Sequence, residues 1–225
     1  RMSFPLRIVR SNRRTLAIEI DRDAQVIVRS PRRLSDKEIL KFVDEKRDWI
    51  QKNIMKSVKE VRKRPNHSFE DGELHWYLGE QYHLITSVIS RRSVDFDGAF
   101  YFHPSVKSKR KDILLKWYKL QAKRYIRERT PVFAKLMKTD FSDLRISSAK
   151  TRWGSCGPKN SLNFNWRLIM SPADVFDAII VHELAHTKHK NHGVKFWELV
   201  QKHAPNHKVA DHWLRDHRVH LEALD

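Results

Sequence analysis

The segment His182-Glu183-Leu184-Ala185-His186 constrains this chain more than any other part of its sequence. On an α-helix, residues four apart differ by about 40° in direction and about 6 Å in height, so both imidazoles point the same way. Two such imidazoles can bind one zinc ion at about 2.0–2.1 Å. The carboxylate of Glu183 would then reach a water molecule at the metal. The segment therefore predicts a metal-binding helix with Glu183 as general base.

The flanking residues support this helix. Ser171 and Pro172 are typical of a helix start, with serine as N-cap and proline at the first helical position. Apolar residues at 179–181 and at Leu184 and Ala185 surround the polar side chains. The histidines are therefore expected in a buried setting from which most water is excluded.

A catalytic zinc site needs a third protein ligand and one open position. His192 follows His182 by ten residues, and on a continuous helix it would lie about 15 Å further along, facing elsewhere. The chain must therefore leave the helix between His186 and His192. Asn191 and Gly193 both tolerate left-handed backbone, which favours a reversal at this point.

Other residues compete for roles at this site. The spacing matches the metzincin pattern HExxHxxGxxH, but His189 occupies the glycine position, so the turn must differ from a metzincin turn. Glu198 is an alternative third ligand, and His207 is a candidate for stabilising an oxyanion. The other C-terminal histidines are expected on the surface; they are His203, His212, His217 and His220.

The charge of the chain points to a class of partner. Forty-five basic and 27 acidic residues give a net charge of +18, which favours nucleic acid, nucleotides or acidic proteins. The basic residues are dispersed, so a solvated surface is the alternative. No apolar run approaches the roughly 18 residues of a membrane span, and no signal-peptide stretch opens the chain. With Cys156 as its single cysteine, the protein is predicted to be cytoplasmic and free of disulfides.

The pattern of apolar residues predicts an α+β fold in two parts. A hairpin over 16–28, a helix near 36–60 and short strands up to 102 indicate a small N-terminal α+β module, 1–105. Helices around 113–126 and 132–137 follow, and then strands around Leu144–Ser147 and Leu162–Arg167. The second part, 106–225, ends with the metal-binding helix and a closing helix.

Several motifs in fixed order resemble one known family. The chain is similar to the YgjP-like metallopeptidases, which are related to the SprT-like zincins. The matching segments are Val181–His186, Asn191–Gly193, Phe196–Trp197, Arg152–Cys156, Asn165–Leu168, Arg13–Leu16, Val28–Pro31 and Tyr77–Gly79. This resemblance implies a compact zincin-like domain with His182, His186 and His192 as zinc ligands and Glu183 as base. It does not identify the substrate.

The two upstream motifs suggest substrate contacts. Zincins commonly hold substrate along a strand beside the metal helix, and Arg152 or Arg167 could bind a carboxylate or phosphate there. The alternative is that Trp153 and Trp166 pack in the core while the arginines pair with acidic neighbours. Cys156 is expected to be a packed thiol, with an inhibitory thiolate on the metal as the alternative.

These observations predict a zinc-dependent hydrolase with one zinc ion, and a peptide or an unfolded protein is the leading substrate class. A metal-dependent nucleoside triphosphate hydrolase is the second hypothesis, because of the positive charge and the Lewis acidity of a metal. The third is a nucleic-acid-binding protein in which zinc is structural. Glu183 argues against this third hypothesis, because a purely structural site needs no carboxylate beside its ligand.

Overall fold

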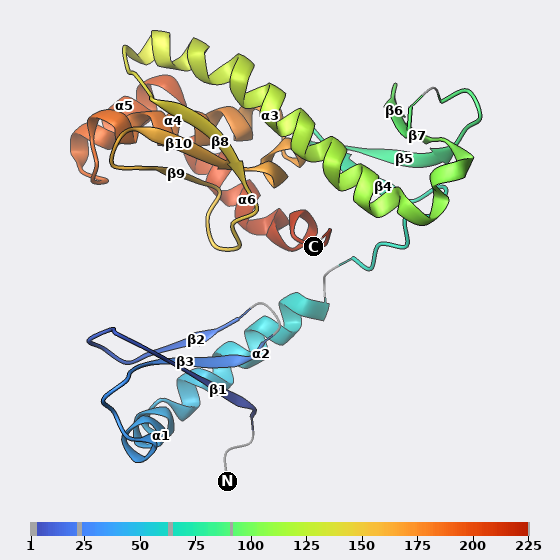
Figure 1. The fold of residues 1–225 in the computed structure, drawn as a ribbon. Coiled ribbons are helices and arrows are strands. Elements are labelled where there is room, and N and C mark those ends of the chain that lie inside the picture. Colours follow the sequence, from blue (N-terminus) through green and yellow to red (C-terminus); the bar gives the residue numbers. More distant parts are fainter. Residues whose placement is uncertain (1–3, 22–23, 63–64, 91, 225) are drawn as a thin grey trace. The chain divides into compact units, whose positions relative to one another are not determined.

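The computed structural model describes residues 4–21, 24–62, 65–90 and 92–224 (Figure 1). It divides into two compact units, Arg1–Pro65 and Asn66–Asp225. The division falls before the boundary that the sequence predicts near 105. The reason is that Leu84, Phe100 and Phe102 are buried in the same core as Leu114 and Tyr118 of the second unit.

The first unit is a small sheet with two helices. Its elements are β1 (Leu6–Ser11), β2 (Ala17–Ile20), β3 (Val26–Pro31), α1 (Asp36–Glu45) and α2 (Arg47–Arg62). The predicted hairpin is confirmed, because β2 pairs antiparallel with β3, while β1 pairs with β3 in parallel. The single helix predicted near 36–60 is wrong, since α1 ends at a C-cap, Lys46, and α2 begins after it. Both helices turn apolar residues inward, among them Ile39, Val43 and Ile50.

The second unit contains two sheets and most of the helices. Its first elements are β4 (Leu74–Tyr77), β5 (Glu80–Thr86), β6 (Val94–Phe96), β7 (Phe100–Phe102), the 3-10 helix η1 (Pro104–Lys109) and α3 (Arg110–Met137). Then come β8 (Asp143–Ser147), β9 (Gly154–Cys156), β10 (Ser161–Asn165), the 3-10 helix η2 (Trp166–Met170), α4 (Ala173–Lys188), α5 (Val194–His203) and α6 (His207–Leu221). The predicted α+β class is confirmed.

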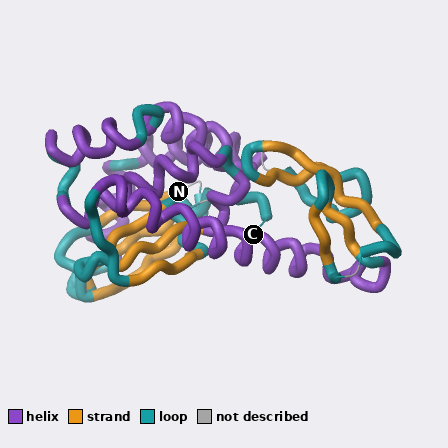
Figure 2. The backbone as a smooth tube through the Cα atoms, turned by 90° about the horizontal axis from the view of Figure 1, so that it is seen from above, coloured by secondary structure: helices purple, strands orange, loops and turns teal. Residues whose placement is uncertain are grey.

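The two sheets of this unit are connected by α3. The sheet β4-β5-β7-β6 lies near the start of the helix, and the sheet β8-β10-β9 lies along its later turns (Figure 1 and Figure 2). The sequence predicts two helices here, but α3 continues through Pro131. Ile126, Thr130 and Ala134 are all buried four residues apart, so one inward stripe spans the proline.

The core of the second unit holds α4 in place. Phe176, Ile180 and Leu184 are fully buried, and α4 contacts α3, α5, α6 and β9. Its N-cap is Pro172, one residue later than predicted, and the Ser171 hydroxyl donates to the Leu168 carbonyl instead of capping the helix. No helix among the described residues is long and apolar enough to cross a membrane.

Candidate metal centre

Two histidines lie on the same side of α4. The ring centroids of His182 and His186 are 5.0 Å apart, as expected for residues one helical turn apart. The neighbouring helix α5 places Phe196, which is fully buried, against both rings. The aromatic ring of Phe196 therefore gives the two imidazoles an apolar surface to pack on.

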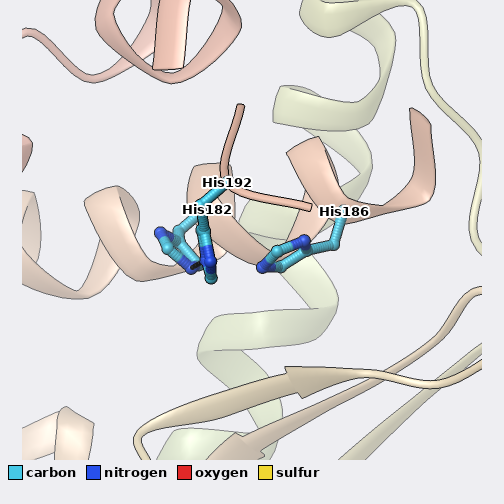
Figure 3. A group of neighbouring side chains, drawn as sticks. All are labelled: His182, His186 and His192. Carbon is cyan, nitrogen blue, oxygen red and sulfur yellow. Dashed lines mark hydrogen bonds between the residues drawn. The ribbon is translucent and has the colours of Figure 1, made fainter. Parts of the chain in front are cut away.

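The loop between α4 and α5 returns a third histidine to this pair. As predicted, the chain leaves the helix after Lys188, and the Nε2 atoms of His192 and His182 are 3.2 Å apart. Ligand atoms of His182, His186 and His192 all lie within 4.8 Å of one another (Figure 3). The predicted left-handed reversal is wrong, because neither Asn191 nor Gly193 has a positive φ.

The three imidazoles are suited to a metal ion. Burial, together with the charges of His186 and His192, lowers the pKa of His182 to about 4. Burial also lowers the pKa of His186. Near neutral pH these two rings are uncharged and keep a lone pair. Nδ1 of His186 donates to the His189 carbonyl at 3.1 Å, which leaves the lone pair of Nε2 free to coordinate a metal ion. This set of nitrogen donors fits zinc.

Glu183 is buried on the neighbouring face of α4. Only 6% of the residue is exposed. Burial raises the pKa of its carboxyl to about 7, and the charge of Arg152 opposes that rise. A carboxyl group with a pKa near neutral can both accept and return a proton at physiological pH.

The strand β9 packs directly against this carboxylate. A Cβ atom added to Gly154 would fall 2.4 Å from Oε1 of Glu183 and 2.6 Å from its Cγ. Among the described residues β9 pairs only with β10, so it is an edge strand with one free side. The sequence reasoning did not assign Gly154 a role. The one available signal was a glycine between Trp153 and Ser155 in a strand-like segment.

Gly154→Ala is therefore expected to displace the carboxylate of Glu183, the predicted base. Hydrolysis should fall by roughly 100-fold, because small misplacements of a catalytic group are costly. Metal content should not change. Gly157→Ala is the control: it perturbs the same hairpin, but its new methyl group would meet the Ser161 hydroxyl. Steady-state rates of the two variants measure the difference. Equal rates would show that Gly154 does not position the base.

A cavity of about 1230 Å³ opens over these residues. Its lining includes His182, Glu183, His192, Gly154 and Trp197. Two of the sequence candidates, Glu198 and His207, also line it, but Glu198 is not grouped with the three histidines as a possible ligand.

His207, the first residue of α6, stacks on Trp197 with ring centroids 5.4 Å apart. Its Nδ1 donates to the Ala204 carbonyl at 3.1 Å. With Nδ1 holding that proton, Nε2 becomes a donor only in the imidazolium form. His207 can therefore stabilise an oxyanion only when it is positively charged.

The two predicted substrate arginines lie in different settings. Arg152 is exposed, and its charge acts on Glu183. Arg167 is 1% exposed, donates to Oδ1 of Asn165 at 3.1 Å and lies over the ring of its neighbour Trp166. It is absent from the described lining of the cavity. The structure thus places Arg167 in the core of the unit, outside the described lining of this cavity.

Cys156 packs at the end of β9. Its Sγ lies 3.7 Å from Nζ of Lys190 and 3.6 Å from the Gly157 carbonyl oxygen. Burial raises the pKa of the thiol, and the charge of Lys190 opposes this. It is not grouped with the three histidines. This placement is consistent with the packed thiol that the sequence analysis expects.

Three converging imidazoles with a buried carboxylate beside them form a site of the metal-dependent hydrolase class. The model of the YgjP-like metallopeptidase domain family matches residues 14–217, so the chain belongs to this family and the resemblance seen in the sequence is confirmed. Membership in this family supports the assignment of the chain as a metal-dependent hydrolase and implies that it binds a divalent metal ion. Neither a comparison with curated proteins nor one with solved structures found a match.

Proposed function

We propose that this protein is a zinc-dependent peptidase in which His182, His186 and His192 hold one zinc ion. Glu183 is the general base. The observation that carries the proposal is the contact between the Glu183 carboxylate and Gly154 of the edge strand β9. An extended polypeptide that adds to the free side of β9 by backbone hydrogen bonds passes next to the base and the three histidines.

When bound, the zinc ion supplies Lewis acidity, which polarises a carbonyl group and lowers the pKa of a water molecule to about 7. Glu183 takes a proton from the attacking water and returns it to the leaving amine. Trp197 and Ile179 give the cavity apolar walls that limit the access of other water. His207, in its imidazolium form, donates from Nε2 to the developing oxyanion.

The free edge of β9, and not the charge of the cavity, favours a peptide over a nucleoside triphosphate. The described lining carries the carboxylates of Glu183, Glu198 and Asp211. Its fixed cations are Lys208 and Arg215, and Arg215 donates to Asp211 at 2.6 Å. The bound zinc ion would add two positive charges to this lining, so charge does not select between the two substrates. The free edge of β9 does, because its backbone groups can pair with a peptide and not with a nucleoside triphosphate.

The test is a parallel screen of the zinc-loaded protein against unfolded proteins, peptides and nucleoside triphosphates. Mass spectrometry detects new peptide termini, and a colorimetric assay detects released phosphate or pyrophosphate. We expect cleaved peptides, and Glu183→Gln should abolish them. Hydrolysis of triphosphates without peptide cleavage would contradict the proposal and support the alternative activity.

Nucleic acid binding through the basic surface stays a prediction. The net charge of +18 is its basis. If the protein binds nucleic acid, its affinity should fall as salt is added. A plot of log affinity against log salt concentration should have a slope of close to one unit for each phosphate neutralised.

A further inference from the structure

A second group of side chains of the kinds that bind metal ions lies in the same unit but outside the cavity. His67, Glu73 and His75 bring their ligand atoms within 4.8 Å of one another. None of the three lines the large cavity over α4. His67 and Glu73 belong to the segment before and at the start of the β4 hairpin, and His75 lies in β4 itself.

The segment folds around the Glu73 carboxylate. Oε2 accepts from the backbone N–H of Ser68 at 2.8 Å, from the Ser68 hydroxyl at 2.7 Å and from the backbone N–H of Phe69 at 2.6 Å. The Phe69 carbonyl in turn accepts from Nη1 of Arg110 at 3.0 Å. These bonds hold the other oxygen, Oε1, toward the two imidazoles.

Hydrogen bonding does not account for the buried member of the group. Nδ1 of His67 contacts Oε1 of Glu73, and the two histidine rings stack with centroids 4.5 Å apart. Nε2 of His75 lies 3.0 Å from the same oxygen, yet it makes no hydrogen bond among the described residues. The residue is only 1% exposed. A buried nitrogen without a hydrogen bond is costly, and coordination of an ion would satisfy it.

We propose that His67, Glu73 and His75 form a second zinc site, outside the cavity and independent of the site on α4. Two imidazole nitrogens and one carboxylate oxygen are a ligand set that zinc prefers, whereas calcium and magnesium take oxygen ligands. The fourth ligand is a water molecule, since Glu73 and His67 keep 18% and 13% of their side chains exposed. The ion fastens the segment before β4 to the strand.

The experiment measures zinc per chain in the full-length protein after loading with Zn²⁺ and dialysis against metal-free buffer. The parent is expected to hold two ions, and Glu73→Gln and His67→Ala one each. The glutamine of the first variant would keep an oxygen acceptor for the loop while losing the charge, so Glu73→Gln is the variant more certain to fold. His212→Ala is the control, because its side chain is 70% exposed and pairs only with Asp216 among the described residues.

His192→Ala separates the two sites. It is expected to retain one ion, and the double variant His192→Ala/Glu73→Gln none. Cobalt bound to His192→Ala should give the visible absorption of a four-coordinate site, and a chelator should lower the thermal midpoint of this variant but not that of the double variant. One ion in the parent and none in His192→Ala would overturn the second site, leaving a hydrogen-bonded His–Glu–His network. One ion in His192→Ala but none in Glu73→Gln would support it and refute the proposed catalytic centre.

Discussion

Glu183→Gln is expected to keep the metal and the fold but to lower hydrolysis by roughly 10²–10⁴-fold, the usual contribution of a general base. Glutamine has the same shape, so it fits against Gly154 without a new clash, but it cannot accept the proton of the attacking water. Glu183 is 6% exposed and lies against the strand on which substrate is proposed to pair. The measurement is kcat on the peptide found in the screen, with metal content as a second readout.

Glu198→Gln is the matched control for this prediction. Glu198 lines the same cavity but is not grouped with the three histidines, so its loss tests for a general effect of removing one carboxylate. Its rate should stay within a few-fold of the parent. If Glu183→Gln also did so, a different base or a different site would have to carry the reaction.

His192→Ala is expected to lose one zinc ion per chain and essentially all hydrolysis. The imidazole is the proposed ligand from the loop after α4, and two histidines on one helix turn would leave the ion with too few protein ligands. Its ring also packs on Phe196 and Trp197, but the side chain is exposed, so the fold should survive. Elemental analysis and the far-ultraviolet circular dichroism spectrum measure the two expectations.

His189→Ala is a control from the same loop. The His189 carbonyl, which accepts from Nδ1 of His186, belongs to the backbone and remains in the variant. Metal content should therefore match that of the parent. Full zinc occupancy in His192→Ala would refute the ligand assignment, and Glu198 on the cavity wall would become the next candidate.

The sequence predicted the elements of the site that are local in the chain. His182 and His186 are four residues apart, so helical geometry alone places them together, and the distance to His192 requires the helix to end. The backbone conformation of the loop that brings His192 back to the helix was not predictable in the same way. Many short loops bring one side chain back, and the observed one uses no left-handed residue at Asn191 or Gly193.

Contacts between distant segments were beyond the sequence pattern. Arg167 was a candidate for substrate binding because of its motif, but a 3-10 helix buries it against Asn165 and Trp166. The expected boundary near 105 followed a polar stretch, while the actual division at Pro65 depends on Phe100 and Phe102 packing into the larger core. Alternating apolar residues identify a strand, but they do not state which core will cover it.

The sequence by itself determined the family to which the chain belongs and predicted the helix that carries two histidines with a glutamate beside them, because each depends on residues close together or in fixed order. Only the tertiary structure placed Gly154 against Glu183 and gathered His67, Glu73 and His75 around one point. The glycine comes from another strand, and the spacing of the three residues follows no helical or strand period. The proximity of these residues depends on the conformation of loops and on packing between elements, and local sequence preferences specify neither.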